Sequence, residues 1–285
     1  MIPPPVHDPV TAQNRAPPWP VARGTGSSQK DHAMVQRRAV LAALSTLPFA
    51  AAFPVAAQET PMADTIDTSE GELAIHPVEH ASLVLALGDT VIYVDPVGAP
   101  DLYAGLPAPT AVLITHEHGD HFNAELIAAL APEAPIIVNP AVFAMLPEAL
   151  AASATALANG DAGTLAGIPV QAVPAYNTTP ERQNFHPQGR DNGYILTFGD
   201  TRVLIAGDTE DTPELRGLSD IAVAFLPMNL PYTMAVEQAA DAVNAFRPAI
   251  VYPYHYGDSD LDAFEVAVGD GIEVRRRNWY PHGSS

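Results

Sequence analysis

Metal-binding residue types crowd one short segment of the chain. Residues 115–121 read THEHGDH and directly follow an apolar run. Four of them can bind metal: His116, His118, Asp120 and His121. Imidazole and carboxylate are the ligands that zinc takes when thiolates are absent, and the chain has no cysteine. In a turn, the first two histidines can point to one side and the aspartate with the last histidine to another. The spacing therefore predicts a site for two adjacent ions.

Three more candidate ligands lie near expected strand ends further along the chain. They are His186 in the sequence FHP, Asp208 in AGDT and His255 in PYHYG. The first lies before an apolar run, and the AGDT and PYHYG sequences each directly follow one. Loops at strand ends can gather distant side chains into one site. We therefore expect these residues to join the cluster.

The ordered motifs resemble those of the metallo-β-lactamase-like superfamily of metal-dependent hydrolases. Residues 115–121 are similar to the His-x-His-x-Asp-His signature of that family, and the later motifs follow in the family's order. The HAS sequence at residues 80–82 is similar to the first strand of a subgroup that includes ascorbate-6-phosphate lactonase. The resemblance covers roughly residues 72–280.

This resemblance implies a centre of two divalent ions, expected to be zinc, with manganese or iron as alternatives. The ligands of the first ion would be His116, His118 and His186. Those of the second would be Asp120, His121 and His255, with Asp208 bridging both ions. A hydroxide between the ions would attack the substrate, with the two aspartates as catalytic carboxylates. A divalent ion can lower the pKa of bound water from about 15.7 to about 7.

The three later ligands each have an alternative role. In many relatives the third histidine closely follows a strand, but here that strand ends near Asn177 with no histidine. Asn177 or water could therefore replace His186, which would then be a plain loop residue. Asp208 could cap the turn that follows it, and His255 could be a hydrogen-bonded core histidine.

Residues outside the ligand set are candidates for supporting roles. His80 either orients a ligand or forms a buried structural hydrogen bond. Tyr232 either lines the pocket or marks a helix start with Thr233 as its cap. Arg182 and Arg190 stand out in a chain with few cations, and we expect one of them to pair with an anionic group of the substrate. Arg190 is a candidate either for that contact or for supporting a ligand from behind.

Short apolar runs predict the elements that carry these motifs. Strands dominate the first part and alternate with helices after the middle, which favours a layered α/β fold. The expected strands are 73–78, 82–87, 90–94, 112–114, 136–138, 168–173, 194–198, 202–205, 221–225, 250–252 and 272–275. The expected helices are 124–130, 141–151, 234–246 and 261–268. The family resemblance implies, more specifically, a four-layer αβ/βα sandwich over residues 72–285.

The composition restricts the partners of the protein. The formal charge is −20, from 33 acidic and 13 basic residues. Such a surface repels phosphate backbones and anionic membranes, so we expect a small-molecule substrate and no nucleic acid. With 47% hydrophobic residues, a chain of 285 residues can build one sizeable core.

The N-terminal region predicts a targeting signal rather than a fold. Residues 1–33 have the composition of a disordered extension, and Met34 is an alternative start. Residues 34–57 combine paired arginines, an uncharged run and a small-residue end, which is typical of a signal peptide cleaved after Ala57. The arginine pair favours twin-arginine export to the periplasm or the exterior, with an uncleaved membrane anchor as the alternative. We expect a linker over 58–71 and no stable membrane insertion after cleavage.

These features together predict an exported two-metal hydrolase that attacks an ester, lactone or phosphodiester. A zinc β-lactamase fits less well, because one group of these enzymes needs a cysteine ligand and another lacks a bridging aspartate. Diiron oxidoreductases of the same fold carry glutamate at the position of His118 and an added flavin domain. A non-catalytic metal-binding protein of the same fold is the remaining alternative.

Overall fold

A computed structural model describes residues 63–281 and Gly283. All described residues belong to one compact unit of the chain. The extension and the signal peptide expected over residues 1–57 therefore lie outside the described residues. In the described part, no helix is both long and apolar enough to cross a membrane.

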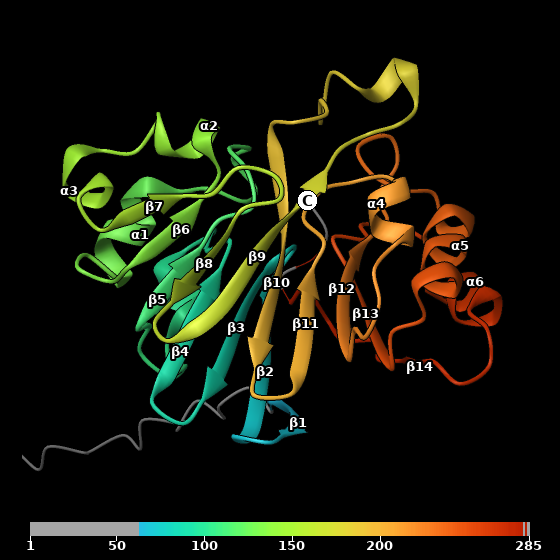
Figure 1. The fold of residues 1–285 in the computed structure, drawn as a ribbon, viewed down its shortest axis with the longest axis horizontal. Coiled ribbons are helices and arrows are strands. Elements are labelled where there is room, and N and C mark those ends of the chain that lie inside the picture. Colours follow the sequence, from blue (N-terminus) through green and yellow to red (C-terminus); the bar gives the residue numbers. More distant parts are fainter. Residues whose placement is uncertain (1–62, 282, 284–285) are drawn as a thin grey trace, which may run out of the picture. The chain divides into compact units, whose positions relative to one another are not determined.

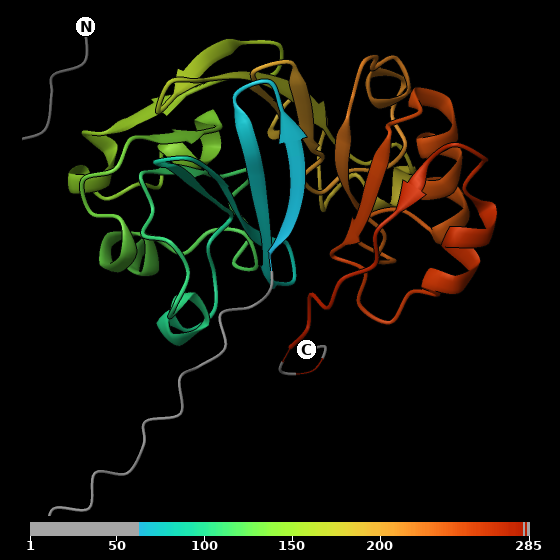
Figure 2. The same cartoon turned by 90° about the horizontal axis from the view of Figure 1, so that it is seen from below.

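Two seven-stranded sheets form the centre of this unit (Figures 1 and 2). In each sheet the first four strands run antiparallel and the last three continue in parallel. The first sheet contains β1 (Asp64–Thr68), β2 (Gly71–Glu79), β3 (Ser82–Leu87), β4 (Thr90–Val94), β5 (Ala111–Leu113), β6 (Ile136–Val138) and β7 (Ala154–Ala156). The second contains β8 (Ala162–Leu165), β9 (Ile168–Ala175), β10 (Asp191–Phe198), β11 (Thr201–Ile205), β12 (Val223–Pro227), β13 (Ile250–Tyr254) and β14 (Glu273–Val274).

Helices cover the outer face of each sheet, so the unit has four layers (Figure 1). The helices on the first sheet are α1 (Ala124–Leu130), α2 (Pro140–Phe143) and α3 (Glu148–Ala151). Those on the second are α4 (Pro213–Arg216), α5 (Val236–Phe246) and α6 (Leu261–Ala267). Two 3₁₀ turns, Pro100–Tyr103 and Pro180–Arg182, lie in loops. This architecture confirms the expected αβ/βα sandwich.

The inner faces of the two sheets share one central core. In β10, Tyr194, Leu196 and Phe198 belong to this core, whereas Ile195 packs with the outer helices. The alternation is the period-two pattern of a strand that is buried on both faces. Burial on both sides holds β10 rigidly, and β10 begins directly after one of the loops that carries a candidate ligand.

The loops with the candidate ligands meet at one edge of the sheets. β11 and β13 run parallel within the second sheet and both end before such a loop, so their loops leave the same edge. β5 contributes its loop from the first sheet. The β9–β10 loop, yellow in Figure 1, rises above the same edge. Distant parts of the chain are thereby gathered at one place.

The single helix expected over residues 141–151 is wrong. The structure has two short helices there, α2 and α3, and Pro147 lies between them as the N-cap of α3. Proline has no N–H to donate, and it disfavours a helical conformation in the residue before it. The proline therefore ends the first helix and starts the second.

The folded unit also begins earlier than expected. β1 pairs antiparallel with β2, with Asp64 opposite Ile75, so the linker expected over 58–71 is wrong for residues 64–71. Ile66 alone in β1 packs against the central core. One apolar residue among polar neighbours gives too weak a pattern to predict a strand. The short β7 and β8, with sequences ATA and AGTL, were missed for a similar reason.

Gly193→Ala tests how closely β10 approaches the end of β11. A Cβ at Gly193 would lie 2.6 Å from the Ala206 carbonyl oxygen and 2.9 Å from that of Ile205, so the backbone must shift. We expect the free energy of unfolding to fall by about 1–3 kcal/mol, as in an overpacked core. Urea unfolding followed by circular dichroism measures this change.

Gly163→Ala in β8 is the matched control. Its Cβ would meet the flexible side chain of Leu157 at 3.4 Å, which is an ordinary contact. We expect its unfolding midpoint to stay close to that of the unmodified chain. Equal midpoints for both variants would contradict the close approach at Gly193.

Candidate metal centre

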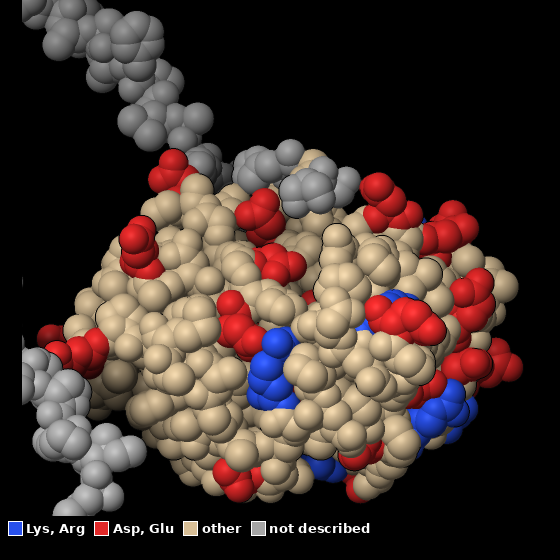
Figure 3. All heavy atoms as spheres, turned by 90° about the horizontal axis from the view of Figure 1, so that it is seen from above, with Lys and Arg blue, Asp and Glu red and all other residues tan. Residues whose placement is uncertain are grey.

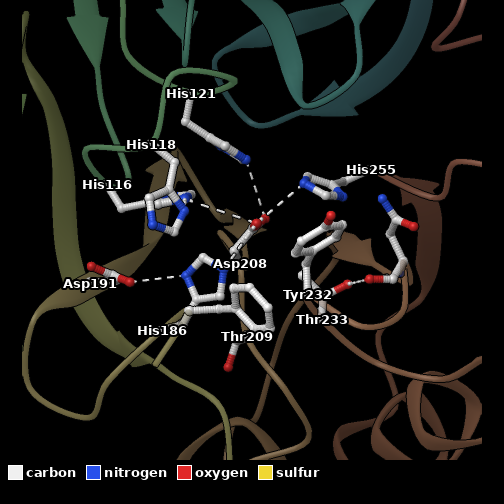
Figure 4. Close-up of polar contacts among 12 residues, drawn as sticks. His116, His118, His121, His186, Asp191, Asp208, Thr209, Tyr232, Thr233 and His255 are labelled. Atoms are coloured by element: carbon white, nitrogen blue, oxygen red, sulfur yellow. Dashed lines mark hydrogen bonds and ion pairs between the residues drawn. The ribbon is translucent and has the colours of Figure 1, made fainter. Parts of the chain in front are cut away.

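Three histidines form the first cluster of ligand atoms (Figure 4). His116 and His118 lie on the loop after β5, and His186 lies on the loop before β10. One ring nitrogen of each lies within 4.8 Å of the other two. His116 Nε2 and His118 Nδ1 are 3.1 Å apart. The structure thus brings together the set that the sequence predicts for a first ion.

Asp120, His121 and His255 form the second cluster, with His80 as a fourth member. The first two residues continue the loop after β5, and His255 directly follows β13. His80 follows β2, and its Nε2 lies 3.1 Å from Asp120 Oδ2. The set predicted for a second ion is therefore also brought together, and His80 lies beside it rather than in the apolar core.

Asp208 lies where the two clusters meet. Its carboxylate is 3.3 Å from His121 Nε2 and 3.2 Å from His255 Nε2. On the other side it is 3.4 Å from His186 Nε2 (Figure 4). Its side chain is only 2% exposed. This is the position that a residue bridging two ions requires.

The buried donor atoms of the site fit divalent cations. His121 Nε2, His255 Nε2 and Asp208 Oδ1 are buried and have no hydrogen-bond partner. Folded proteins rarely leave buried polar atoms in this state, because each costs about 1–3 kcal/mol. Imidazole nitrogens and carboxylate oxygens are the donors that zinc accepts in sites without cysteine. Cations between these atoms would satisfy all three.

Two carboxylates behind the clusters determine which imidazole nitrogen faces inward. Asp95 Oδ2 lies 2.8 Å from His121 Nδ1, and Asp191 Oδ2 lies 3.0 Å from His186 Nδ1. Because a carboxylate accepts hydrogen bonds, each Nδ1 carries a proton that it donates outward. In the neutral ring each Nε2 then presents its lone pair to the centre, which is the tautomer that a metal ligand needs.

Asp95 and Asp191 are functional residues that the sequence analysis missed. Asp95 is fully buried directly after β4, where it accepts hydrogen bonds from the Thr115 backbone N–H at 2.8 Å and the Thr115 hydroxyl at 2.6 Å. It thereby ties the end of β4 to the start of the metal-binding loop. The signal in the sequence is an aspartate directly after an apolar strand.

Arg190 supports Asp191 instead of facing the cavity. Its Nε lies 2.7 Å from Asp191 Oδ1, and its Nη2 donates to the Phe185 carbonyl oxygen at 2.7 Å. Its Nη1 lies 2.9 Å from Glu117 Oε1. Every guanidinium nitrogen is thus engaged within the protein, and Arg190 lies behind a candidate ligand, as one of its two expected roles requires. The arginine holds the carboxylate that orients His186.

Arg182 and Asn177 hold the loop before β10. Arg182 pairs with the buried Glu210 at 2.8 Å and donates to the Thr233 carbonyl oxygen at 3.1 Å. The Asn177 amide donates to two backbone carbonyl oxygens at 3.0 and 2.7 Å. Asn177 therefore anchors the loop, and His186 is the residue of this loop that lies with the first cluster.

Neighbouring charges shift the pKa values of the candidate ligands. Burial disfavours a charge on His255, but the Asp208 and Asp120 carboxylates overcome it and raise the pKa of His255 to about 9. Burial has the same effect on His121, but Asp208 and Asp95 raise the pKa of His121 well above its usual value. Burial disfavours the charged form of Asp208, but the adjacent imidazoles outweigh this effect and hold the Asp208 pKa well below its usual range. In the absence of cations, two of the histidines are therefore protonated at neutral pH.

A cavity of about 480 Å³ opens over the two clusters. Phe185 and Tyr232 form an edge-to-face aromatic pair in its wall, with ring centroids 5.1 Å apart. Tyr232 is 45% exposed and lines the cavity, as one of its two expected roles requires. Glu79 also lines the wall, whereas no described lysine or arginine does. Figure 3, which looks onto the edge with the ligand loops, shows acidic side chains spread over this face and few basic ones.

A family model described as Beta-lactamase superfamily domain matches residues 74–255. The chain belongs to the metallo-β-lactamase superfamily. A relative of this hydrolase, the UPF0173 metal-dependent hydrolase of Pyrobaculum arsenaticum, is 31% identical over 194 residues, which cover 64% of this chain and 83% of the relative. The corresponding protein of Thermus thermophilus is 29% identical and covers 62% of this chain and 80% of its own.

Solved structures support the assignment of the chain to this family. A Parabacteroides distasonis chain assigned to the metal-dependent hydrolases is 46% identical, with a TM-score of 0.70, over 76% of this chain and 98% of its own. The metallo-hydrolase Igni18 of Ignicoccus hospitalis shares the fold, with a TM-score of 0.61 at 22% identity over 72% of this chain and 95% of its own. The protein is therefore a metal-dependent hydrolase with a histidine–aspartate metal site.

Zinc added to the metal-free metallo-hydrolase at pH 7 is expected to release protons. His255, with a pKa of about 9, and His121 are protonated at this pH, and a cation must displace a proton from each Nε2. Calorimetry in two buffers of different ionisation enthalpy should count about one to two protons per chain. Because the protons compete with the cation below a pH of about 9, affinity should weaken as the pH falls. A binding heat that does not depend on the buffer would contradict this account.

Proposed function

We propose that this hydrolase uses two zinc-type cations. His116, His118 and His186 would hold the first, and Asp120, His121 and His255 would hold the second, with Asp208 between them. The observation that carries the proposal is the buried Asp208 carboxylate, within 3.4 Å of imidazoles from both clusters. When bound, such cations supply a water of lowered pKa and polarise the substrate oxygen.

The two aspartates of the site have different surroundings and, in our proposal, different roles. Asp208 is buried, so its carboxylate is available to cations and shielded from solvent. Asp120 is 50% exposed and lines the cavity, where it can meet both a cation and the reacting end of a substrate. We assign Asp208 the bridging role and Asp120 the positioning of the attacking water.

The cavity wall favours an uncharged ester or lactone as the substrate. Phe185 and Tyr232 offer an apolar surface beside the ligands. Glu79 adds negative charge to the wall, and among the described residues no cationic side chain lines it. A phosphate remote from the reacting bond would therefore find no partner here. This argues against substrates such as ascorbate 6-phosphate and leaves esters and lactones with apolar substituents.

We also propose that the chain is exported. The support is the sequence pattern of residues 34–57, which lie outside the described residues. N-terminal sequencing of the protein from its native source tests this, since a mature chain that begins at Gln58 is expected. A start upstream of residue 57 would contradict it.

A panel of substrates tests the proposed reaction. The zinc-loaded chain should hydrolyse a neutral aryl ester or an alkyl lactone, and Asp208→Ala should lower kcat/KM by more than about 100-fold, because loss of an outer-shell partner alone costs about 10–100-fold. Asp67→Ala, on the exposed face of β1, is the matched control and should leave kcat/KM unchanged.

The same panel separates the proposed substrate classes. A lactone that carries a remote phosphate should be hydrolysed more slowly than its neutral analogue. A preference for that phosphorylated lactone, or for a phosphodiester, would overturn the substrate class. Full activity of Asp208→Ala would overturn the metal site itself.

A further inference from the structure

His80 makes the closest side-chain contact to the exposed carboxylate of the second cluster. His80 Nε2 lies 3.1 Å from Asp120 Oδ2, and the His80 ring packs against the His255 ring with centroids 3.8 Å apart. Asp120 is 50% exposed, whereas Asp208 is 2% exposed. Packing therefore does little to fix the Asp120 carboxylate, and its orientation depends on hydrogen bonds.

Asp120 and Tyr280 together set which nitrogen of His80 carries the proton. The carboxylate only accepts, so Nε2 donates to it, and the Tyr280 hydroxyl can donate to Nδ1. The Tyr280 hydroxyl accepts a hydrogen bond from the Gly257 backbone N–H at 2.8 Å and lies 3.2 Å from His80 Nδ1. Since the hydroxyl oxygen accepts from Gly257, its own proton is available to His80 Nδ1. A neutral imidazole that accepts at Nδ1 has its proton on Nε2, and this N–H points at Asp120.

The backbone around His80 fixes this arrangement in place. The His80 N–H donates to the Trp279 carbonyl oxygen at 2.7 Å, and the His80 carbonyl oxygen accepts from the His255 N–H at 2.9 Å. The Trp279 side chain is fully buried in the central core. Tyr280 is therefore held against the end of β2 and is not a loosely attached terminal residue.

We infer that His80 and Tyr280 are positioning residues for Asp120. Tyr280 holds His80 in the tautomer that donates from Nε2, and His80 holds the Asp120 carboxylate toward the second cation. The inference rests on the proposed two-cation site and adds to it a hydrogen-bonded chain that runs from Gly257 through Tyr280 and His80 to Asp120.

The opposite tautomer would give His80 a different role. With the proton on Nδ1, the Nε2 lone pair would be free, and His80 would be a direct ligand because it lies with the second cluster. The Asp120 carboxylate, which only accepts, favours the tautomer with the proton on Nε2, and hence the positioning role. The two roles respond differently to substitution with glutamine, which retains an N–H donor but has no ring nitrogen.

Zinc titration of the metal-free protein tests the inference. In His80→Leu the second zinc equivalent should bind about 10–100-fold more weakly, which is the usual loss when a residue that orients a metal ligand is removed. In Tyr280→Phe it should bind about tenfold more weakly. The affinity for the first equivalent should be unchanged in both variants. His80→Gln should bind both equivalents as the unmodified chain does. Tyr256→Phe is the matched control, because its hydroxyl bonds the Arg277 carbonyl oxygen and its ring lies 5.0 Å from that of Tyr280.

Several outcomes would overturn the inference, and they differ from failure of the proposed function. Second-ion affinity that is unchanged in both His80→Leu and Tyr280→Phe would show that neither residue positions Asp120. If His80→Gln binds the second equivalent weakly and the absorption spectrum of its cobalt-loaded form shows a changed coordination, His80 is a ligand instead. If the unmodified chain binds only one zinc ion, the two-cation proposal itself is wrong. Melting temperatures of the metal-free variants identify any general loss of folding.

Discussion

The site depends on a buried carboxylate that must always be neutralised. Asp208 lies among imidazoles from both clusters, and a buried charge left without a partner costs about 3–5 kcal/mol. In the metal-free chain the partners are protonated His121 and His255, whose raised pKa values follow from this contact. Cations would replace those protons, so protons and cations compete for one set of lone pairs.

The two-sheet architecture explains how side chains so distant in sequence reach this carboxylate. Both sheets direct strand ends to one edge, and each supplies part of both clusters. The first sheet contributes the loop after β5, and Asp95 fastens that loop to the end of β4. The second contributes Asp208, His255 and the loop of His186, whose orientation is fixed by Asp191 and Arg190. The ligands are thus held by rigid strand ends and by buried carboxylates behind them.

The candidate ligands in a compact motif could be predicted from the sequence, whereas the residues that hold these ligands in place could not. The spacing in THEHGDH and the strand-end positions of Asp208 and His255 identified residues that the structure brings together. Asp95 was missed because a lone aspartate after a strand has many possible roles, and its partners lie about 20 residues or more away in sequence. The sequence left two roles open for Arg190, because the direction of a long side chain depends on tertiary neighbours. The same holds for the secondary structure: strands with apolar runs were predicted, but the polar strand β1 was not.

Anomalous X-ray scattering at the zinc absorption edge, from crystals of the zinc-loaded chain, tests the central claim most directly. The account predicts two peaks, one among His116, His118 and His186 and one among Asp120, His121 and His255, with Asp208 in contact with both. A single peak, or peaks away from Asp208, would contradict it.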